Sequence, residues 1–167
     1  PISFVFPIAG YSRKIKSVSD LKDGATIAIP NDTTNEARAL LLLETIGLIK
    51  VDPKAGLEAT PTDVIENPKN IVFKELEAAQ LARSLPDVDL AVINGNYAIE
   101  AGLNAGTDAI AKEEKDSLAA QTYANIVAVR AGEETSEKTL ALMKALQSEK
   151  VISFIESNYQ GAVVPMS

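Results

Sequence analysis

The sequence predicts an α/β fold, on three observations. First, short runs rich in β-branched residues alternate with segments of helical periodicity, and this alternation is typical of a sheet covered by helices. Second, residues 26–29 and 90–93 are almost entirely apolar, as expected for parallel strands buried on both faces. Third, the 167 residues are 46% hydrophobic and 23% charged, so the chain can bury one sizeable core or two small ones.

The strands are expected where β-branched and aromatic residues gather in short runs bounded by turn residues. They are ISFVF (2–6), ATIAIP (25–30), IVFKELE (71–77), VDLAVIN (88–94) and NIVAVR (125–130). The two apolar runs should lie in the middle of the sheet, because only central strands have helices on both faces.

The strongest helical pattern covers residues 34–46. Thr33 and Glu36 have the spacing of a capping box, and Gly47 supplies a C-terminal stop. Three weaker helices are predicted at 61–67, 77–85 and 96–102, where Pro68, Pro86 and Gly102 mark the ends. Helices and strands therefore alternate through most of the chain.

The later part of the chain is predicted to hold a connector, a strand and two helices. We interpret the charge run AKEEKDS, residues 111–117, as a solvated connector and not as a binding patch. After the strand at 125–130, two helices are expected with a break near Ser148. Their apolar stripe should pack in a core: Leu140, Met143, Leu146, Val151, Ile152 and Ile155.

The chain begins with PISFVFPIAGYS, which reads as the interior of a strand. No element precedes that strand to pair with it. We therefore expect the strand at 2–6 and the two C-terminal helices to need sheet partners that these residues supply only in part, and a further segment upstream.

Charge and composition exclude several classes of function. Sixteen basic and twenty-three acidic residues give a net charge of −7, which disfavours nucleic acid as a partner. The chain has no His and no Cys, so it contains no Ser-His-Asp or Cys-His nucleophile and no Cys-ligated zinc site. No metal or other cofactor is expected. No run reaches the roughly 20 apolar residues of a membrane-spanning helix.

Asn35 and Arg38 are the first candidate binding residues. They lie three positions apart, and hence on one face, in the first turns of the helix at 34–46, where free backbone N–H groups and the positive end of the helix dipole lie. A guanidinium offers two parallel hydrogen bonds to a carboxylate. The alternative is an arginine that pairs with a structural glutamate or simply extends to solvent, and spacing alone does not decide between these possibilities.

Asn94 and Asn125 are the second pair of candidates. Asn94 follows an apolar strand at its carboxyl end, where ligands of open α/β sheets collect. Its amide suits an ammonium or a carboxylate, or it could cap the next helix. Asn125, in the stretch TYAN, opens the last strand and could bind ligand or simply stand at a strand edge.

Glu75 and Glu77 lie on one face of a strand, but we do not interpret them as an acid-base pair. Glu77 begins a helix, where a negative charge is favourable, and no apolar pocket is evident that would separate their pKa values. The sequence therefore offers no catalytic constellation, and we expect no enzyme activity.

Three stretches together resemble one family closely. They are FVFPIAGYSRKIKSVSDLKDGATIAIPNDTTNEARALLLLETIGLIK, ENPKNIVFKELEAAQLARSLPDVDLAVINGNYAIEAGL and YANIVAV. They resemble the methionine-binding lipoproteins of the NlpA type, the substrate-binding subunits of bacterial methionine ABC importers. The most specific motif is PND-x-x-N-x-x-R followed by a leucine run, and the resemblance extends from about residue 4 to the end.

The resemblance implies the two-lobed periplasmic binding protein fold (type II), with the ligand between two α/β lobes. Residues 16–110 would form the complete second lobe. Residues 1–15 would be part of lobe 1 and a crossover, and residues 111–167 would be a second crossover and the C-terminal part of lobe 1.

The resemblance also implies the ligand and its contacts. The family's amino-acid-binding residues correspond to Arg38, Asn35, Asn94 and Asn125, with Arg38 holding the carboxylate of L- or D-methionine. The protein would deliver methionine to the membrane subunits of an ABC transporter. It would lie in the periplasm or at the outer face of the cell membrane, lipid-anchored through an N-terminal cysteine that these residues lack.

Family members carry roughly another third of chain before the position of Pro1, including residues that enclose the ligand side chain. This N-terminal segment would be a partner of the present residues. Without it, the preference for methionine, another amino acid or a small peptide stays open, as does a role in ligand sensing without transport. A sensing regulator would need a DNA-binding module, and a transferase of this fold would need a nucleophile in the cleft.

Overall fold

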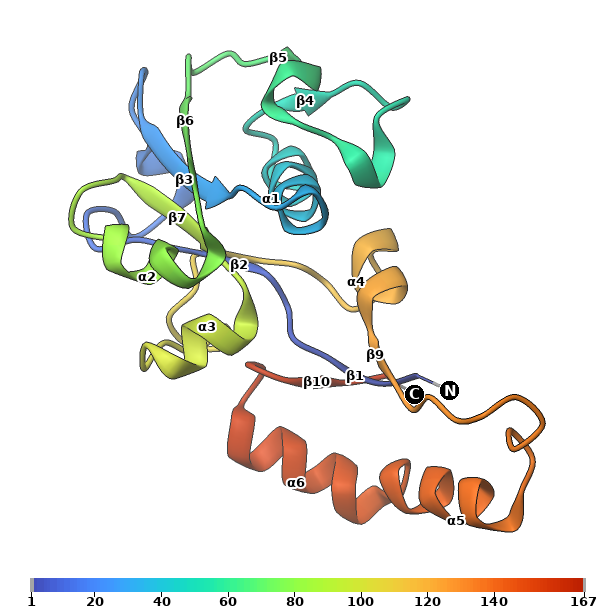
Figure 1. Cartoon of the computed structure of the whole chain (residues 1–167). Coiled ribbons are helices and arrows are strands. Elements are labelled where there is room, and N and C mark those ends of the chain that lie inside the picture. Colours follow the sequence, from blue (N-terminus) through green and yellow to red (C-terminus); the bar gives the residue numbers. More distant parts are fainter. Residues whose placement is uncertain (1, 167) are drawn as a thin grey trace.

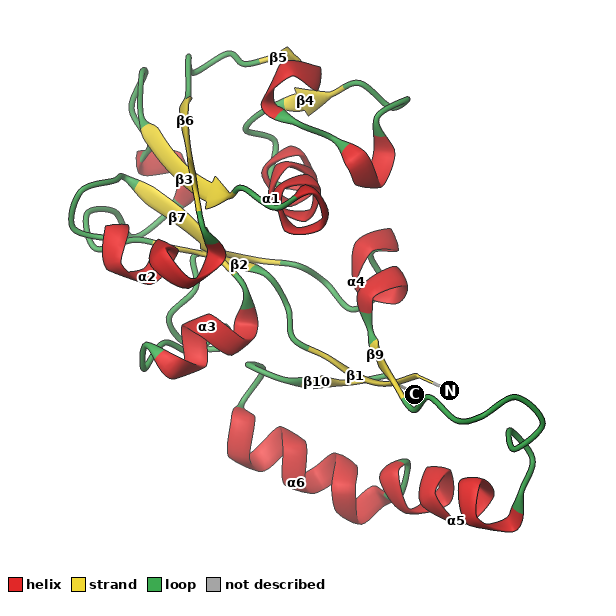
Figure 2. Cartoon of the chain, viewed as in Figure 1, coloured by secondary structure: helices red, strands yellow, loops and turns green. Residues whose placement is uncertain are grey.

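The protein, seen in a computed structural model, is described from residue 2 to residue 166. Pro1 and Ser167 lie outside the described residues. Figure 1 shows a five-stranded sheet with helices on both faces, and a three-stranded sheet beside two C-terminal helices. Figure 2 shows helices and strands alternating along the chain, which confirms the predicted mixed α/β fold.

The five-stranded sheet has the order β6-β3-β7-β2-β8. Its strands are β6 Val72–Leu76, β3 Thr26–Pro30, β7 Leu90–Ile93, β2 Ala9–Tyr11 and β8 Ala111–Lys112. The strand β3 pairs in parallel with β6 and β7, whereas β2 runs antiparallel to both β7 and β8. The sheet is therefore mixed, and the two strands at one end of its order, β2 and β8, come from just outside residues 16–110.

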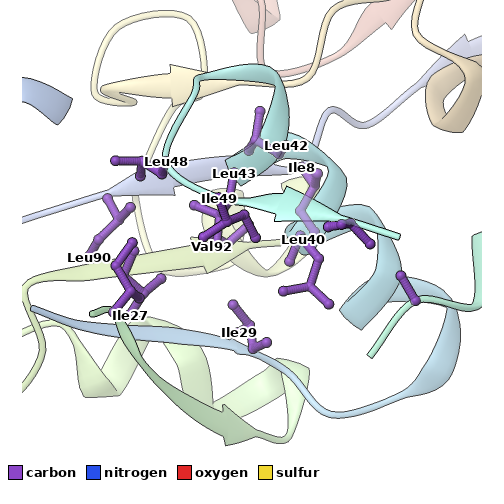
Figure 3. Packing of buried hydrophobic residues seen from close by; sticks show 14 of the residues in the cluster. Ile8, Ile27, Ile29, Leu40, Leu42, Leu43, Leu48, Ile49, Leu90 and Val92 are labelled. Atoms are coloured by element: carbon purple, nitrogen blue, oxygen red, sulfur yellow. The ribbon is translucent and has the colours of Figure 1, made fainter. Parts of the chain in front are cut away.

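Both faces of β3 and β7 are covered, as their apolar sequences predicted. Ile27 and Ile29 of β3 pack with Leu40 and Leu43 in one core, which Figure 3 shows from close by. Ala28 of β3 belongs to a second core on the opposite face. That second core is closed by α2 (Leu81–Ser84) and α3 (Gly95–Glu100). Alternate residues of one strand thus enter different cores.

The helix α1 spans Thr33–Thr45, one residue earlier at each end than predicted. The predicted capping box is wrong, because the N-cap is Asp32, whose carboxylate accepts a hydrogen bond from the backbone N–H of Asn35. Glu36 is buried instead of reaching back to the cap. An aspartate cap satisfies an N-terminal N–H and suits the dipole, so the box was not needed.

The helix predicted at residues 61–67 is largely wrong. Pro61–Asp63 form a single 3-10 turn, and Val64–Glu66 form the strand β5, which pairs with β4 (Lys50–Val51). The proline at the first helical position fits a helix start, but pairing with β4 ends the helical stretch after one turn. Three further 3-10 turns are η1 Val18–Asp20, η2 Gly56–Glu58 and η4 Ala78–Gln80.

The three-stranded sheet has the order β10-β1-β9. Its strands are β1 Ile2–Val5, β9 Asn125–Ile126 and β10 Val164–Pro165. The expectation that these residues supply sheet partners only in part is wrong for the first strand, because β1 is central and pairs antiparallel with both neighbours. The last predicted strand is shorter than expected and ends at Ile126.

Three helices accompany the three-stranded sheet: α4 Leu118–Tyr123, α5 Glu137–Leu146 and α6 Glu149–Tyr159. Ser148 caps α6, so the predicted break is confirmed. The predicted core stripe is only partly buried, because Met143 is buried whereas Leu140 is 55% exposed. Among the described residues, no helix combines the length and apolarity that crossing a membrane requires.

Candidate functional site

Arg38 and Asn125, two of the four predicted binding residues, contact the backbone of β1 and of the residue that follows it. Asn125 donates from Nδ2 to the carbonyl oxygen of Phe4 at 3.3 Å. Arg38 donates from Nη2 to the carbonyl oxygen of Phe6, also at 3.3 Å. A side chain of α1 therefore contacts the chain where it leaves β1, and a side chain of β9 contacts β1 itself.

Gly95, the residue after Asn94, lies against Phe6, whose carbonyl oxygen accepts the hydrogen bond from Arg38. A Cβ atom on Gly95 would lie 2.8 Å from the Cβ of Phe6, so only glycine fits without a shift. The start of α3 therefore packs directly against Phe6.

Arg38 is not on an exposed face, since only 7% of it is accessible. Its Nη2 lies 2.5 Å from Oε2 of Glu113, and its Nε donates to Oε1 of Glu113 at 3.2 Å. The ring of Tyr123 lies 5.6 Å from the guanidinium carbon, within range of a cation–π contact. Glu113 is itself 7% exposed, so the interpretation of residues 111–117 as a solvated connector is wrong at this position.

The bidentate fork expected for a ligand carboxylate is therefore occupied by Glu113. A structural glutamate was the alternative that spacing left open, and this structure contains it. Nη1 of Arg38 makes no hydrogen bond to any residue between 2 and 166, so two of its five N–H groups are unused there. A carboxylate can approach Arg38 at this nitrogen.

Asn35 and Asn94 are hydrogen-bonded to each other. Nδ2 of Asn94 donates to Oδ1 of Asn35 at 2.7 Å, and Nδ2 of Asn35 donates to the carboxylate of Asp32 at 2.8 Å. A carboxylate only accepts, so Asp32 fixes the orientation of both amides. Oδ1 of Asn94 is buried and has no partner among the described residues. It is an oriented acceptor suited to an ammonium group.

Glu36 is a buried carboxyl group that the sequence interpretation missed. It is 5% exposed, and its Oε1 has no partner among the described residues. Burial, followed by a hydrogen bond to Glu75 and the charges of Glu75 and Asp32, raises the pKa of Glu36 from 4.5 to about 7. Glu36, Leu40 and Leu43 share one helix face, and this spacing was the available signal for its burial.

A cavity of about 410 Å³ lies beside Arg38, between α1 and the segment that follows β8. Its wall includes Arg38, Leu41, Glu113 and Leu118, but not Asn35, Asn94 or Asn125. The structure thus joins Asn35 to Asn94, and it brings Asn125 to β1 and Arg38 to the backbone just after β1. It does not place all four residues around one cavity.

Comparison with known proteins shows the family of this chain. The family model described as NlpA lipoprotein matches residues 3–167. The chain belongs to the NlpA lipoprotein family. An NlpA-family relative, named probable D-methionine-binding lipoprotein MetQ, from Pasteurella multocida is 50% identical over 162 residues, which are 97% of this chain and 57% of that protein.

Two solved structures share the NlpA fold. A nutrient-binding protein from Burkholderia cenocepacia bound to methionine is 47% identical with a TM-score of 0.85, over 99% of this chain and 68% of that chain. A periplasmic substrate-binding protein of an ABC transporter from Coxiella burnetii is 45% identical with the same TM-score and coverage. The present chain spans 57 to 60% of the length of the first curated relatives that it matches.

Proposed function

We propose that this protein is an extracytoplasmic solute-binding protein that captures methionine and delivers it to an ABC importer, without catalysing a reaction. The observation that carries this proposal is the methionine-bound relative, which is 47% identical over 99% of the chain. The name of the Pasteurella relative and the description of the Coxiella protein support the ligand and the transporter, respectively.

The polar groups of the site suit the two charged ends of an amino acid. The ligand carboxylate would take Nη1 of Arg38, and the ammonium would take the unpaired Oδ1 of Asn94. Asn35 would hold Asn94 in the accepting orientation. Asn125 would add a contact from the three-stranded sheet. We call the five-stranded sheet with its helices and the three-stranded sheet with its helices the two bodies, and one ligand would touch both.

Delivery would follow from lobe closure. Residues 16–110 would form one lobe. Residues 1–15 and 111–167 would provide the crossovers and part of the other lobe. An N-terminal segment of the same protein would complete the pocket for the thioether. Methionine would favour the closed arrangement, and the membrane subunits of the importer would distinguish it from the open one. A lipid anchor on an N-terminal cysteine would keep the protein at the outer face of the membrane.

Isothermal titration calorimetry of the complete gene product with L- and D-methionine tests the proposal. We expect heat of binding without consumption of the ligand. Asn94→Ala and Asn125→Ala should each weaken binding by about 1–3 kcal/mol, because each would leave a charged ligand group short of one partner. Asn96→Ala is the matched control, since Asn96 is exposed on α3 next to Asn94, and it should bind as the wild type does.

The same titration separates the alternatives. Tighter binding of another amino acid or of a small peptide would replace methionine as the ligand and keep the binding role. Retained affinity for methionine with no stimulation of the importer's ATPase would favour a ligand sensor. Absence of methionine binding by the complete product would refute the proposal.

A further inference from the structure

Arg38 contacts both segments that connect the two sheets. We name residues 6–8, between β1 and β2, the first crossing, and residues 113–117, between β8 and α4, the second crossing. Arg38 donates to the carbonyl oxygen of Phe6 in the first crossing and pairs with Glu113 in the second. One side chain of α1 is therefore tied to both routes between the sheets.

The two crossings are also bonded to each other at Glu113. The backbone N–H of Glu113 donates to the carbonyl oxygen of Ile8 at 2.9 Å, and the N–H of Ile8 points to Oε2 of Glu113 at 3.4 Å. The same Oε2 atom receives Nη2 of Arg38. A change at this carboxylate therefore reaches the guanidinium and both crossings.

Burial makes this contact rigid. Arg38 and Glu113 are each 7% exposed, and two hydrogen bonds join their planar groups, so neither side chain can turn without separating buried opposite charges. The contact leaves Nη1 as the part of the guanidinium with unused donors. Glu113 thus determines which edge of Arg38 is available to a ligand.

We propose that Glu113 is a positioning residue that aims Nη1 of Arg38 at the ligand carboxylate and couples that contact to the relative orientation of the two sheets. This inference rests on the proposed function, since the ligand contact at Arg38 is part of it. The ligand carboxylate and the carboxylate of Glu113 would bind different edges of one guanidinium, so Glu113 would set the direction in which Nη1 meets the ligand. Because Phe6 and Glu113 hold that guanidinium from the two crossings, the direction of Nη1 depends on how the two sheets are oriented.

Glu113→Gln tests the role, because glutamine keeps the size of the side chain and removes its charge. Methionine and methioninamide are titrated into the wild type and the variant. Methioninamide lacks the carboxylate, so the ratio of the two affinities reports the contact at Arg38. We expect Glu113→Gln to lower the preference for methionine at least about fivefold, the lower end of typical coupling between sites, with little change for methioninamide.

Two controls separate positioning from folding. Glu114→Gln changes the adjacent exposed glutamate and should leave the preference unchanged. In an Arg38→Ala background, Glu113→Gln should have no further effect on the preference, since the residue acts through Arg38. An equal loss for both ligands, an unchanged preference or a higher affinity for methionine would each overturn the inference.

A readout without ligand distinguishes this inference from the proposed function. In the ligand-free protein, hydrogen exchange at the amides of Ile8 and Glu113 should accelerate in Glu113→Gln and stay unchanged in Glu114→Gln. If the wild type binds no methionine but the exchange changes as expected, the proposed function fails and the coupling of Arg38 to the crossings stands. If it binds methionine and the exchange does not change, the coupling is wrong.

Discussion

Arg38 carries a buried positive charge, and one carboxylate, that of Glu113, compensates it. Glu113 is 7% exposed, and removal of the arginine takes away its only ion-pair partner among the described residues. An uncompensated buried charge is costly, whereas apolar replacement of both partners is often tolerated. Replacement of Arg38 alone should therefore destabilise the fold.

Arg38→Ala is expected to lower the free energy of unfolding by about 3–5 kcal/mol, because it breaks a buried ion pair. Urea denaturation followed by circular dichroism measures this. Arg83→Ala is the matched control, since Arg83 is an exposed helical arginine and its removal should change stability by less than about 0.5 kcal/mol. The double substitution Arg38→Met, Glu113→Leu should recover most of the loss. Equal effects of the two arginine substitutions would contradict the expectation.

Glu36 gives the fold a dependence on pH. Its pKa is about 7 in the folded protein and near the ordinary 4.5 when unfolded, so between these values the folded state binds more protons. Stability should therefore fall as pH rises from about 4.5 to about 7, and this contribution is lost above that range.

Glu36→Gln should remove this fall, since glutamine keeps a donor toward Glu75 and carries no charge at any pH. Denaturation at pH 5 and pH 8 compares the two proteins, and the variant should gain stability relative to the wild type mainly at pH 8. Glu77→Gln, at an exposed glutamate beyond the end of β6, should keep the wild-type dependence. A wild-type pH profile in Glu36→Gln would show that another group causes the fall.

The sequence predicted that Asn35 and Arg38 lie in the first turns of a helix and that Asn94 follows a buried strand. It could not identify the residues to which they are hydrogen-bonded. Glu113 stands 75 residues from Arg38, and nothing in AKEEKDS distinguishes it from the exposed Glu114. Such a partner is fixed by the antiparallel pairing of β8 with β2, which is a property of the tertiary fold.

At the scale of elements, the best predictions concerned strands buried on both faces. The elements β3 and β7 have continuous apolar runs, and only a central strand suits such a run. The short strands β2, β8 and β10 have two or three residues each, too few for a period to show. Their pairing is decided by the neighbouring strands and not by their own sequence.

The turn after α3 and the end of α6 form a close contact between elements of the two bodies. Nδ2 of Asn104 donates to the carbonyl oxygen of Tyr159 at 3.0 Å. A Cβ atom on Gly106 would lie 1.7 Å from the carbonyl oxygen of Gln160, a distance that requires the backbone to move. Gln160 itself has a φ of 47°, so this helix end is already constrained.

Gly106→Ala is expected to destabilise the protein by about 1–3 kcal/mol, the range for an added methyl group in tightly packed surroundings. Thermal unfolding followed by calorimetry measures the change. Thr107→Ala alters the neighbouring exposed residue and should have little effect. If both variants melt at the wild-type temperature, α6 does not pack against this turn in solution.

For the whole molecule, the two bodies differ in how well their apolar residues are covered. The three-stranded sheet has a small core of Val5, Ala120 and Met166. Beside it, Leu118, Ile126 and Phe154 are between 59 and 69% exposed. An apolar hollow of about 290 Å³ between β1 and α6 adds to this surface. Exposed large apolar side chains around so small a core favour association.

The 167 residues alone should therefore self-associate, and sedimentation velocity should show a sedimentation coefficient that rises with concentration. Phe154→Lys should reduce the association, because it replaces an exposed aromatic ring at the apolar hollow with a charge. We further expect these residues to bind methionine about a hundredfold more weakly than the complete gene product, since burying a methionine side chain contributes about 1.5–3 kcal/mol and lobe closure adds to it. Tight binding by a monomer of these residues would contradict both expectations.

The bonds between the two crossings have a mechanical consequence. The sheets are joined by two backbone segments that are hydrogen-bonded to each other at Ile8 and Glu113, so we expect the sheets to move relative to one another mainly by rotation about this junction. The contact of Asn104 with Tyr159 joins the same bodies at another point, so it must break before such a rotation can occur. One pair of spin labels, one on each sheet, would therefore record the whole motion as a single distance.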